Sequence, residues 1–369
     1  MDAGSIADCL TRDRLTTPAR AAEIDSLLRD GRALSRALRG IGDTVRARVM
    51  DSALARFPNF YRSGLLDDTA RLNRLVDHLN VTQEYVTGRT VQVAFRHYSA
   101  VTPGVAWHYY PYTGAGIFIH PLETVQSLGS ATPDSLRAST DSLIAIGHAF
   151  WKYPVWYVAG GRRFPIWEYL FKNEISDAAT RYRHLLRPPW RSSMPQGDIV
   201  RLYSILYQRT GDEIWARRAR SVLEGFDIPW SAGGLRLDDT THGYWYEEAL
   251  PEAMIWNGSM QALIDVGVYA KTFPGDSLGQ RLWRRGLDAA EYYTPLYDTG
   301  SWLVYSRVQG NVAAHYRNFC VALALALSRM TGDTLQWKSY ARRWAAYSIP
   351  SGTCIGGPCN DAPPPPAIP

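Results

Sequence analysis

The sequence predicts a mainly α-helical protein, an incomplete (α/α) toroid of antiparallel helix pairs with a small β region before it. Two observations lead to this prediction. A unit of helix, Gly-Asp joint and helix occurs three times between residues 202 and 344. The spacing of apolar residues also changes, from three or four residues in the first part of the chain to two residues over 90–98.

The composition suits a large globular protein with an acidic ligand. The 369 residues are 46% hydrophobic, which allows a substantial core. The net charge of +5 is compatible with an acidic partner, and the Lys and Arg residues are scattered, so nucleic acid is not expected. The 22 Tyr and 13 Trp residues outnumber the 10 Phe residues. Tyr and Trp suit sugar binding, but they suit the rim of a large core equally well.

No signal peptide is expected at the start of the chain, and no stretch of about 20 apolar residues predicts a membrane span. The compartment stays open, because removal of a signal is compatible with a secreted or periplasmic protein. Cys354 and Cys359 lie in a Gly- and Pro-rich loop where a disulfide is geometrically feasible. No metal or cofactor is expected, since no zinc pattern, phosphate-binding loop or nicotinamide fingerprint is present.

Residues 1–85 are expected to form an N-terminal helical segment. Apolar residues recur at helical spacing from Pro18 to Arg56, and Thr17 followed by proline is typical of a helix start. A second periodic stretch covers residues 72–79. These patterns predict helices whose apolar faces pack on one another.

Residues 86–130 are expected to form the small β region. The side chains over 90–98 alternate between apolar and polar, as in a half-buried strand, and residues 105–110 and 117–120 continue in this style. The segment 111–116 is rich in glycine and is expected to be a loop.

Residues 131–352 are expected to form the toroid, and the Pro-rich residues 353–369 an extended tail. The repeated joints are Gly211-Asp212, Gly275-Asp276 and Gly332-Asp333, which lie 64 and 57 residues apart. At each joint, glycine is expected to end one helix in the left-handed conformation, and aspartate to cap the next helix.

Two segments between the repeats, 225–250 and 294–318, concentrate glycine, tyrosine and charge. Loops held by a rigid scaffold often carry binding and catalytic residues. The first segment contains Trp-Tyr-Glu-Glu at 245–248, followed by Ile-Trp-Asn-Gly at 255–258. The second contains Pro-Leu-Tyr-Asp-Thr-Gly-Ser at 295–301. We therefore expect the functional residues in the loops at 235–250 and 297–317, facing one common cleft.

These motifs resemble the D-glucuronyl C5-epimerase family over about residues 190–335, and the segment 190–197 matches a further family motif loosely. The resemblance implies a toroid enzyme that acts on uronic-acid polysaccharides. Three departures accompany it. Ala249 stands where the family has tyrosine, His315 to Arg317 replace an Asp-Tyr-His run, and Arg307 follows Tyr305 by two positions rather than three.

The resemblance implies particular roles for these residues. The C5 proton of a uronate lies beside a carboxylate, so its removal requires a base, an acid on the opposite face and neutralisation of an enediolate. Glu248 and Tyr316 are expected on opposite faces of the sugar, with Tyr305 assisting by hydrogen bonding. The residues expected to bind the substrate are Trp245, Tyr246, Asn257, Gln196, Arg307, His315 and Arg317, the last three as partners of its carboxylate.

Plainer interpretations stand beside these roles. Most tyrosines in such a chain belong to a core or its rim, and Glu247 is equally explained as the exposed partner of an arginine. A polysaccharide lyase would use the same C5 carbanion. A glycoside hydrolase would need a second carboxylate, with Asp298 or Asp239 as candidates. A glycan-binding protein would need neither Glu248 nor Tyr316. The expected partner is an anionic polysaccharide, and a homodimer is one alternative for the assembly.

Overall fold

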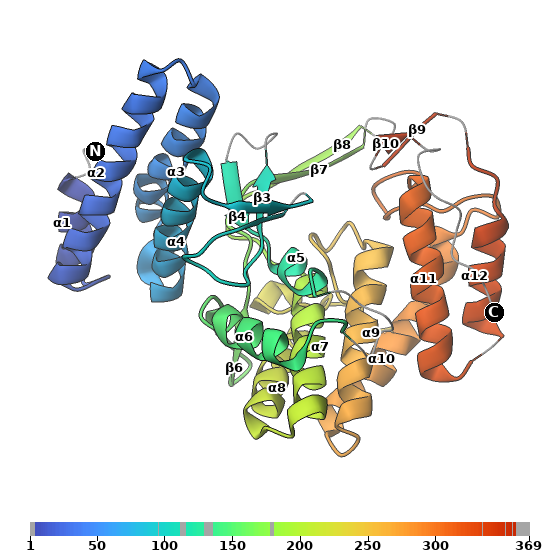
Figure 1. The fold of residues 1–369 in the computed structure, drawn as a ribbon. Coiled ribbons are helices and arrows are strands. Elements are labelled where there is room, and N and C mark those ends of the chain that lie inside the picture. The colour runs from blue at the N-terminus through green and yellow to red at the C-terminus, as the bar shows by residue number, and fades with distance from the viewer. Residues whose placement is uncertain are drawn as a thin grey trace.

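The computed structural model describes residues 4–94, 96–110, 116–128, 136–177, 181–333, 335–350, 352–355 and 357–358. It is mainly helical with small antiparallel sheets, as the sequence predicts. The N-terminal helices lie at one end of the molecule, and the C-terminal helix pairs lie at the other (Figure 1). Within the described residues, no helix combines the length and apolar character needed to cross a membrane.

The N-terminal segment is helical and has its own apolar core. Its elements are α1 (Gly4–Arg12), α2 (Pro18–Gly40), α3 (Thr44–Arg62), the short 3-10 helix η1 (Leu65–Asp67) and α4 (Thr69–Val86). Thr17 caps α2, as expected. The helical pattern is interrupted at Gly42, whose φ of 81° turns the chain before Asp43 caps α3. Two residues of the apolar pattern flank this turn and are exposed, Ile41 at 79% and Val45 at 63%.

The expected β region is a four-stranded antiparallel sheet in the order β1-β2-β3-β4. Its strands are β1 (Val91–Val93), β2 (Arg96–Tyr98), β3 (Trp107–Tyr110) and β4 (Gly116–Ile119), and the helices α5 (Pro121–Gln126) and α6 (Thr140–Phe150) follow. A side chain at Gly116 would meet Val49 of α3 at 2.8 Å, so the sheet lies directly against the N-terminal helices. The loop expected at 111–116 falls mainly outside the described residues.

Two β-hairpins lie in the part of the chain that was expected to be helical. They are formed by β5 (Val155–Ala159) with β6 (Arg162–Ile166), and by β7 (Asn173–Asp177) with β8 (Tyr182–Leu186). The sequence analysis missed both. The strands β7 and β8 contain several polar residues, whereas the short apolar run of β5 is equally compatible with a buried helix segment. The β7–β8 hairpin extends from the side of the small sheet towards the end of the chain (Figure 1).

Three helix pairs form the C-terminal part. They are α7 (Ser193–Thr210) with α8 (Glu213–Asp227), α9 (Trp256–Thr272) with α10 (Ser277–Tyr293), and α11 (Ala314–Thr331) with α12 (Gln336–Ala346). Short 3-10 helices η3 (Trp230–Ala232) and η4 (Thr294–Tyr297) lie between them. Helix α9 packs against α7 and α11, and 14 of its 17 residues are buried. Only 6 of 17 residues are buried in the amphipathic α10. The first helix of each pair is therefore the inner one.

The three joints confirm most of the predicted helix-turn-helix geometry. Gly211 and Gly332 end their helices with φ of 68° and 72°, and Asp212, Asp276 and Asp333 accept hydrogen bonds from backbone N–H groups that follow them. The second joint differs, because α9 ends at Thr272 and Gly275 has no positive φ. Proline follows at 274 and disfavours helical backbone in the residue before it, so the helix stops earlier.

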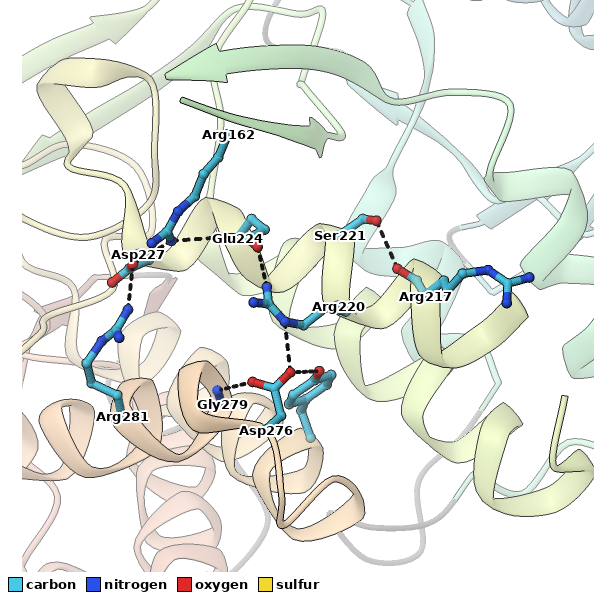
Figure 2. Close-up of polar contacts among 10 residues, drawn as sticks. Arg162, Arg217, Arg220, Ser221, Glu224, Asp227, Asp276, Gly279 and Arg281 are labelled. Carbon is cyan, nitrogen blue, oxygen red and sulfur yellow. Dashed lines mark hydrogen bonds and ion pairs between the residues drawn. The ribbon is translucent and has the colours of Figure 1, made fainter. Parts of the chain in front are cut away.

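Ion pairs connect the outer helices to one another and to β6 (Figure 2). Asp227 of α8 binds Arg162 of β6 at 2.5 Å and Arg281 of α10 at 2.7 Å. Arg220 of α8 binds Asp276, the N-cap of α10, at 2.8 Å. Partly exposed pairs each contribute about 0.5 kcal/mol, so they secure the register of α8 on α10 more than they stabilise the fold.

The helix pairs follow one another in order (Figure 1). The ring closure implied by a toroid stays a prediction. The chain ends in two short strands, β9 (Thr353–Cys354) and β10 (Gly357–Pro358). Cys354 is disulfide-bonded, while Cys359, the partner expected from the sequence, lies outside the described residues. The rest of the expected Pro-rich tail also lies outside them.

Glu168 connects the N-terminal helices to the rest of the molecule. Its side chain is fully buried and accepts two hydrogen bonds of 2.9 Å from the guanidinium of Arg71 on α4. The Tyr157 hydroxyl of β5 donates a third, at 2.6 Å. Arg74, also on α4, donates to the backbone carbonyl of Glu168. A buried carboxylate with these donors is well satisfied, whereas Arg71 without it would be a largely buried cation lacking its strongest partner.

We expect Glu168→Ala to lower the free energy of unfolding by about 3 kcal/mol, because the substitution leaves the Arg71 charge buried. Urea denaturation measures this loss. Asp288→Ala removes an exposed carboxylate that pairs with Arg285 at 3.2 Å, and serves as the control with a loss below about 0.5 kcal/mol. Equal losses in the two variants would contradict the role given to Glu168.

Candidate active site

The turn at Glu247 and Glu248 positions two adjacent carboxyl groups. Glu247 is fully buried, and its Oε1 accepts the backbone N–H groups of Glu248 at 2.9 Å and Ala249 at 3.2 Å. Its backbone carbonyl accepts the N–H of Ser193 at the start of α7. Burial raises the pKa of Glu247 to about 8, and the neighbouring charge of Glu248 adds to the effect. The side chain of Glu247 thus fixes the turn that presents Glu248, and the alternative of an exposed partner for arginine is wrong.

The Glu248 carboxyl lies against the first turn of α9. A Cβ built on Gly258 would meet Oε2 of Glu248 at 2.0 Å and its Cβ at 2.8 Å, so only glycine leaves room for this side chain. Oε2 is buried and makes no hydrogen bond with a described residue. Burial raises the pKa of Glu248 to about 7. A carboxyl with this pKa and an uncommitted oxygen can exchange a proton at neutral pH.

Tyr305 from the 297–317 loop shares a pocket with this carboxyl, and it contacts Tyr316 of α11, which does not itself line that pocket. A hydrogen bond joins the side chains of Tyr305 and Tyr316, and the centroids of their rings are 5.2 Å apart. Burial raises the pKa of Tyr305 well above its usual value, and the charge of Glu248 raises it further. The loop is held to the Glu248 segment because the N–H of Arg307 donates to the carbonyl of Ala253 at 2.8 Å.

A pocket of about 280 Å³ brings the two loops together. Glu248 and Tyr305 line it, which confirms that the segments predicted to carry the site meet in one place. The β7–β8 hairpin supplies another wall, through residues 173–176. Asp177 and the backbone of Ser176 tie the hairpin to the second loop, since they accept hydrogen bonds from the N–H of Gly310 and the amide of Gln309.

Trp190 is a pocket residue without an assigned role in the sequence analysis. It lines the pocket and stacks on Tyr169 with a centroid distance of 4.0 Å and an interplanar angle of 14°. Its indole N–H donates to the carbonyl of Phe171 at 2.8 Å, and reciprocal backbone hydrogen bonds join Trp190 and Tyr169. The loose motif at 190–197 was the available signal, but only the structure shows that its tryptophan reaches the Glu248 pocket.

One group of side chains has the types that a metal ion prefers. His108, His120 and Glu123 place ligand atoms within 4.8 Å of one another. Arg96 pairs with Glu123 at 2.6 Å, and Nδ1 of His120 accepts the backbone N–H of Glu123 at 3.1 Å as the cap of α5. Because these contacts already explain the arrangement, we assign no metal to it.

Comparison with known proteins identifies the segment that carries this pocket. Residues 165–346 match the model of the D-glucuronyl C5-epimerase C-terminus. Residues 165–346 belong to this family. A D-glucuronyl C5-epimerase of Caenorhabditis elegans is 28% identical over 176 residues, which cover 43% of this chain and 27% of that protein. An uncharacterized protein of Methanocaldococcus jannaschii is 27% identical over 187 residues, covering 49% of this chain and 57% of that protein.

The family match includes the Glu248 turn, both tyrosines and the β7–β8 hairpin, and it leaves the N-terminal helices outside. Of the departures from the C5-epimerase motifs, Ala249 lies in the pocket wall. Its small side chain packs in a cluster with Ile175 and Ile255, against which Tyr182 and Trp190 also pack. At position 249, where the family has a tyrosine, this chain has a small residue with the aromatic side chains of Tyr182 and Trp190 beside its cluster.

Several residues expected to bind substrate are instead part of the core. Trp245 is 1% exposed and stacks parallel to Tyr297. Tyr246 is fully buried and donates its hydroxyl to the carbonyl of Leu282 at 2.7 Å. Gln196 is fully buried and bonds both backbone polar groups of Trp167. Asn257 is buried in the first turn of α9. None of these lies among the residues that line the described pocket.

The three expected partners of the substrate carboxylate are placed differently from one another. The guanidinium of Arg317 is buried, bonds Asn318 and the carbonyl of Tyr347, and lies 5.1 Å from the Trp302 ring, so its contacts are structural. His315 is exposed and packs on Tyr316. Arg307 is exposed beside the pocket loop and contacts the sulfur of Met254. Arg307 and His315 therefore keep charge or donor capacity near the tyrosines.

The carboxylates considered for a glycoside hydrolase do not join the pocket. Asp298 accepts hydrogen bonds from Arg343, from the indole of Trp344 and from the Tyr347 hydroxyl, which fix α12 to the loop. Asp239 is exposed and accepts the N–H of Thr241 in a turn. The geometry therefore gives no support to a hydrolase.

We expect Gly258→Ala to lower the pKa of Glu248 from about 7 towards its ordinary value, because the new methyl group pushes the carboxyl out of its buried position. Carbon-13 NMR of labelled glutamate measures the titration. Alanine favours helix, so α9 is retained. Gly275→Ala is the control, since no atom lies within 4 Å of a Cβ there. An unchanged Glu248 titration in Gly258→Ala would contradict the contact.

We expect Glu247→Gln to flatten the pH dependence of stability. The native state holds the Glu247 proton up to about pH 8, whereas the unfolded chain loses it near 4.5, so wild-type stability falls as pH rises through this window. Glutamine keeps the acceptor for the two N–H groups and removes the titration. Urea denaturation at pH 5 and pH 9 should show the variant losing less stability than wild type, by at most a few kcal/mol. Parallel profiles would show that the carboxyl does not titrate in this range.

Proposed function

We propose that this protein is a C5-epimerase that interconverts D-glucuronate and L-iduronate units in a uronic-acid polysaccharide. The observation that carries the proposal is the meeting of Glu248, whose pKa burial raises to about 7, with Tyr305 at a pocket in a segment that matches this family. Tyr305 in turn hydrogen-bonds Tyr316. The lyase alternative has no support from the comparisons, in which one relative is a D-glucuronyl C5-epimerase.

In this mechanism the Glu248 carboxylate removes the C5 proton. The electrons of the C–H bond move towards the neighbouring carboxylate, and an enediolate forms. The hydroxyl of Tyr316 then delivers a proton to C5 from the opposite face, which inverts the centre. Tyr305 hydrogen-bonds Tyr316 and feels the charge of Glu248, so it is suited to pass a proton between them and restore both groups.

The enediolate needs donors or a positive charge beside it. Arg307 is the favoured group, because it is exposed and follows Tyr305 by two residues, and His315 is the second candidate. Trp190 supplies a flat apolar side chain in the wall of the same pocket, which suits the axial face of a pyranose ring. The polymer and its sulfation are not part of the proposal.

We expect wild type to invert C5 of heparosan with uptake of deuterium from heavy water, which NMR of the product detects. Glu248→Gln should lose both exchange and inversion at least about hundredfold, because an amide takes no proton at neutral pH. Tyr316→Phe should invert at least about hundredfold more slowly even where exchange by Glu248 survives.

Tyr292→Phe alters an exposed tyrosine, 51% accessible, and should match wild type. Wild-type inversion in Tyr316→Phe would show that another group delivers the proton. An unsaturated uronate product would show elimination in place of epimerisation.

A further inference from the structure

A second pocket lies outside the site described above, between α3 and the base of the β7–β8 hairpin. Its volume is about 480 Å³, within the usual range for small-molecule sites. Four of its lining residues are cations: Arg56, Arg62, Lys172 and Arg187. None of the lining residues is acidic. Polar side chains such as Asn59 add hydrogen-bonding capacity, so the pocket is chemically suited to an anion.

Arg56 is the least exposed cation of this group and is partly buried. It donates to the backbone carbonyl of Leu170 at 3.1 Å, and its guanidinium carbon lies 4.0 Å from the centre of the Phe118 ring. Its Nε is buried and has no hydrogen-bond partner among the described residues. Burial lowers the pKa of Arg56 to about 9, so it is still charged at neutral pH. A buried cation without a carboxylate partner is costly unless an anion joins it.

Lys172 and Arg187 stand at the mouth of the pocket. They immediately precede β7 and follow β8, and both are exposed. No described carboxylate forms an ion pair with either of them, whereas Arg183 farther along the same hairpin pairs with Glu174 at 2.9 Å. Arg62 on α3 hydrogen-bonds Asn59 at 3.2 Å and carries no carboxylate partner among the described residues. Positive charge is therefore concentrated here without internal neutralisation.

The basic pocket adjoins the Glu248 pocket along the chain. Lys172 is followed directly by Asn173, which lines the Glu248 pocket, and Arg187 lies three residues before Trp190, which also lines it. Neighbouring Cα atoms are about 3.8 Å apart, so the base of the hairpin separates the two pockets by a short distance. A polymer that occupies one pocket has the other within reach of a nearby unit.

We propose that the basic pocket binds an anionic group, a carboxylate or sulfate, on a non-reacting unit of the same polysaccharide. The inference rests on the proposed function for its ligand, and it assigns a role to the N-terminal helices, which lie outside the family match. Contacts with a remote unit supply binding energy that aligns the reacting sugar.

The test compares two double variants of the full chain. Lys172→Ala/Arg187→Ala removes the two exposed cations at the pocket mouth. Arg217→Ala/Arg342→Ala removes two exposed arginines elsewhere, and Figure 2 shows Arg217 directed away from the ion pairs of α8. Both doubles change the net charge equally, and circular dichroism confirms that they fold. The probes are heparosan tetrasaccharide, heparosan dodecasaccharide and inorganic sulfate, with binding measured by calorimetry.

We expect the pocket double to raise the Kd for the dodecasaccharide about tenfold and to weaken its salt dependence, with kcat unchanged at saturation. The tetrasaccharide should be affected less, because it has fewer uronate units that can occupy the basic pocket while another unit occupies the Glu248 pocket. The control double should stay within about twofold of wild type. Equal dodecasaccharide affinity in the two doubles overturns the proposal, and so does a pocket that binds sulfate without any effect on the oligosaccharides.

Deuterium exchange at C5 separates this inference from the proposed function. If wild type exchanges the C5 proton and the two double variants have equal Kd values, the proposed role of the basic pocket is wrong and the proposed epimerase function stands. Wild type that binds the dodecasaccharide through the pocket without exchange supports the pocket and overturns the epimerase. Wild type that neither binds nor exchanges overturns both.

Discussion

The rest of the site depends on the burial of the Glu248 carboxyl against the first turn of α9. That turn is fixed because α9 is covered by α7, α10 and α11, and glycine at 258 leaves the room that the carboxyl occupies. Glu247 holds the approaching chain from the other side through the N–H groups that follow it. Burial raises the proton affinity of Glu248, which is what a base for a weak carbon acid requires.

The pocket also needs elements from distant parts of the chain. The β7–β8 hairpin reaches the second loop through Asp177, and at its base it lies beside α3. Glu168 stands just before this hairpin and is held by Arg71 of α4. One buried ion pair thus couples the N-terminal helices to a wall of the pocket. Helices that lie outside the family match can influence the site through this coupling, even though none of their residues lines the Glu248 pocket.

The sequence predicted the features that depend on local chemistry. Helical periodicity, the aspartate caps at the three joints and the alternation in the small sheet all leave a signal in neighbouring residues. The hairpins at 155–166 and 173–186 were missed, because β7 and β8 contain several polar residues and the short apolar run of β5 does not distinguish a strand from a buried helix segment. The site residues divide in the same way. Glu248 and Tyr305 belong to segments that resemble the family, and they meet at the pocket. Trp245 and Tyr246 belong to the same Trp-Tyr-Glu-Glu motif as Glu248, but they lie in the core. An aromatic residue suits both places, and only the three-dimensional packing decides between them.

In the proposed epimerase reaction, a buried base and an anionic substrate place opposing demands on the protein. Each carboxylate that approaches Glu248 raises the cost of ionising it, so the step that needs the base ionised is opposed by the charge of the polymer itself. Cations placed directly against Glu248 would relieve the repulsion, but they would also lower its pKa and weaken it as a base. Cations at a neighbouring unit avoid this conflict, because they attract the polymer while the hairpin and intervening solvent screen them from Glu248. Under the two proposals, the separation between the basic pocket and the Glu248 pocket allows affinity for a polyanion to coexist with a carboxyl whose pKa burial raises to about 7.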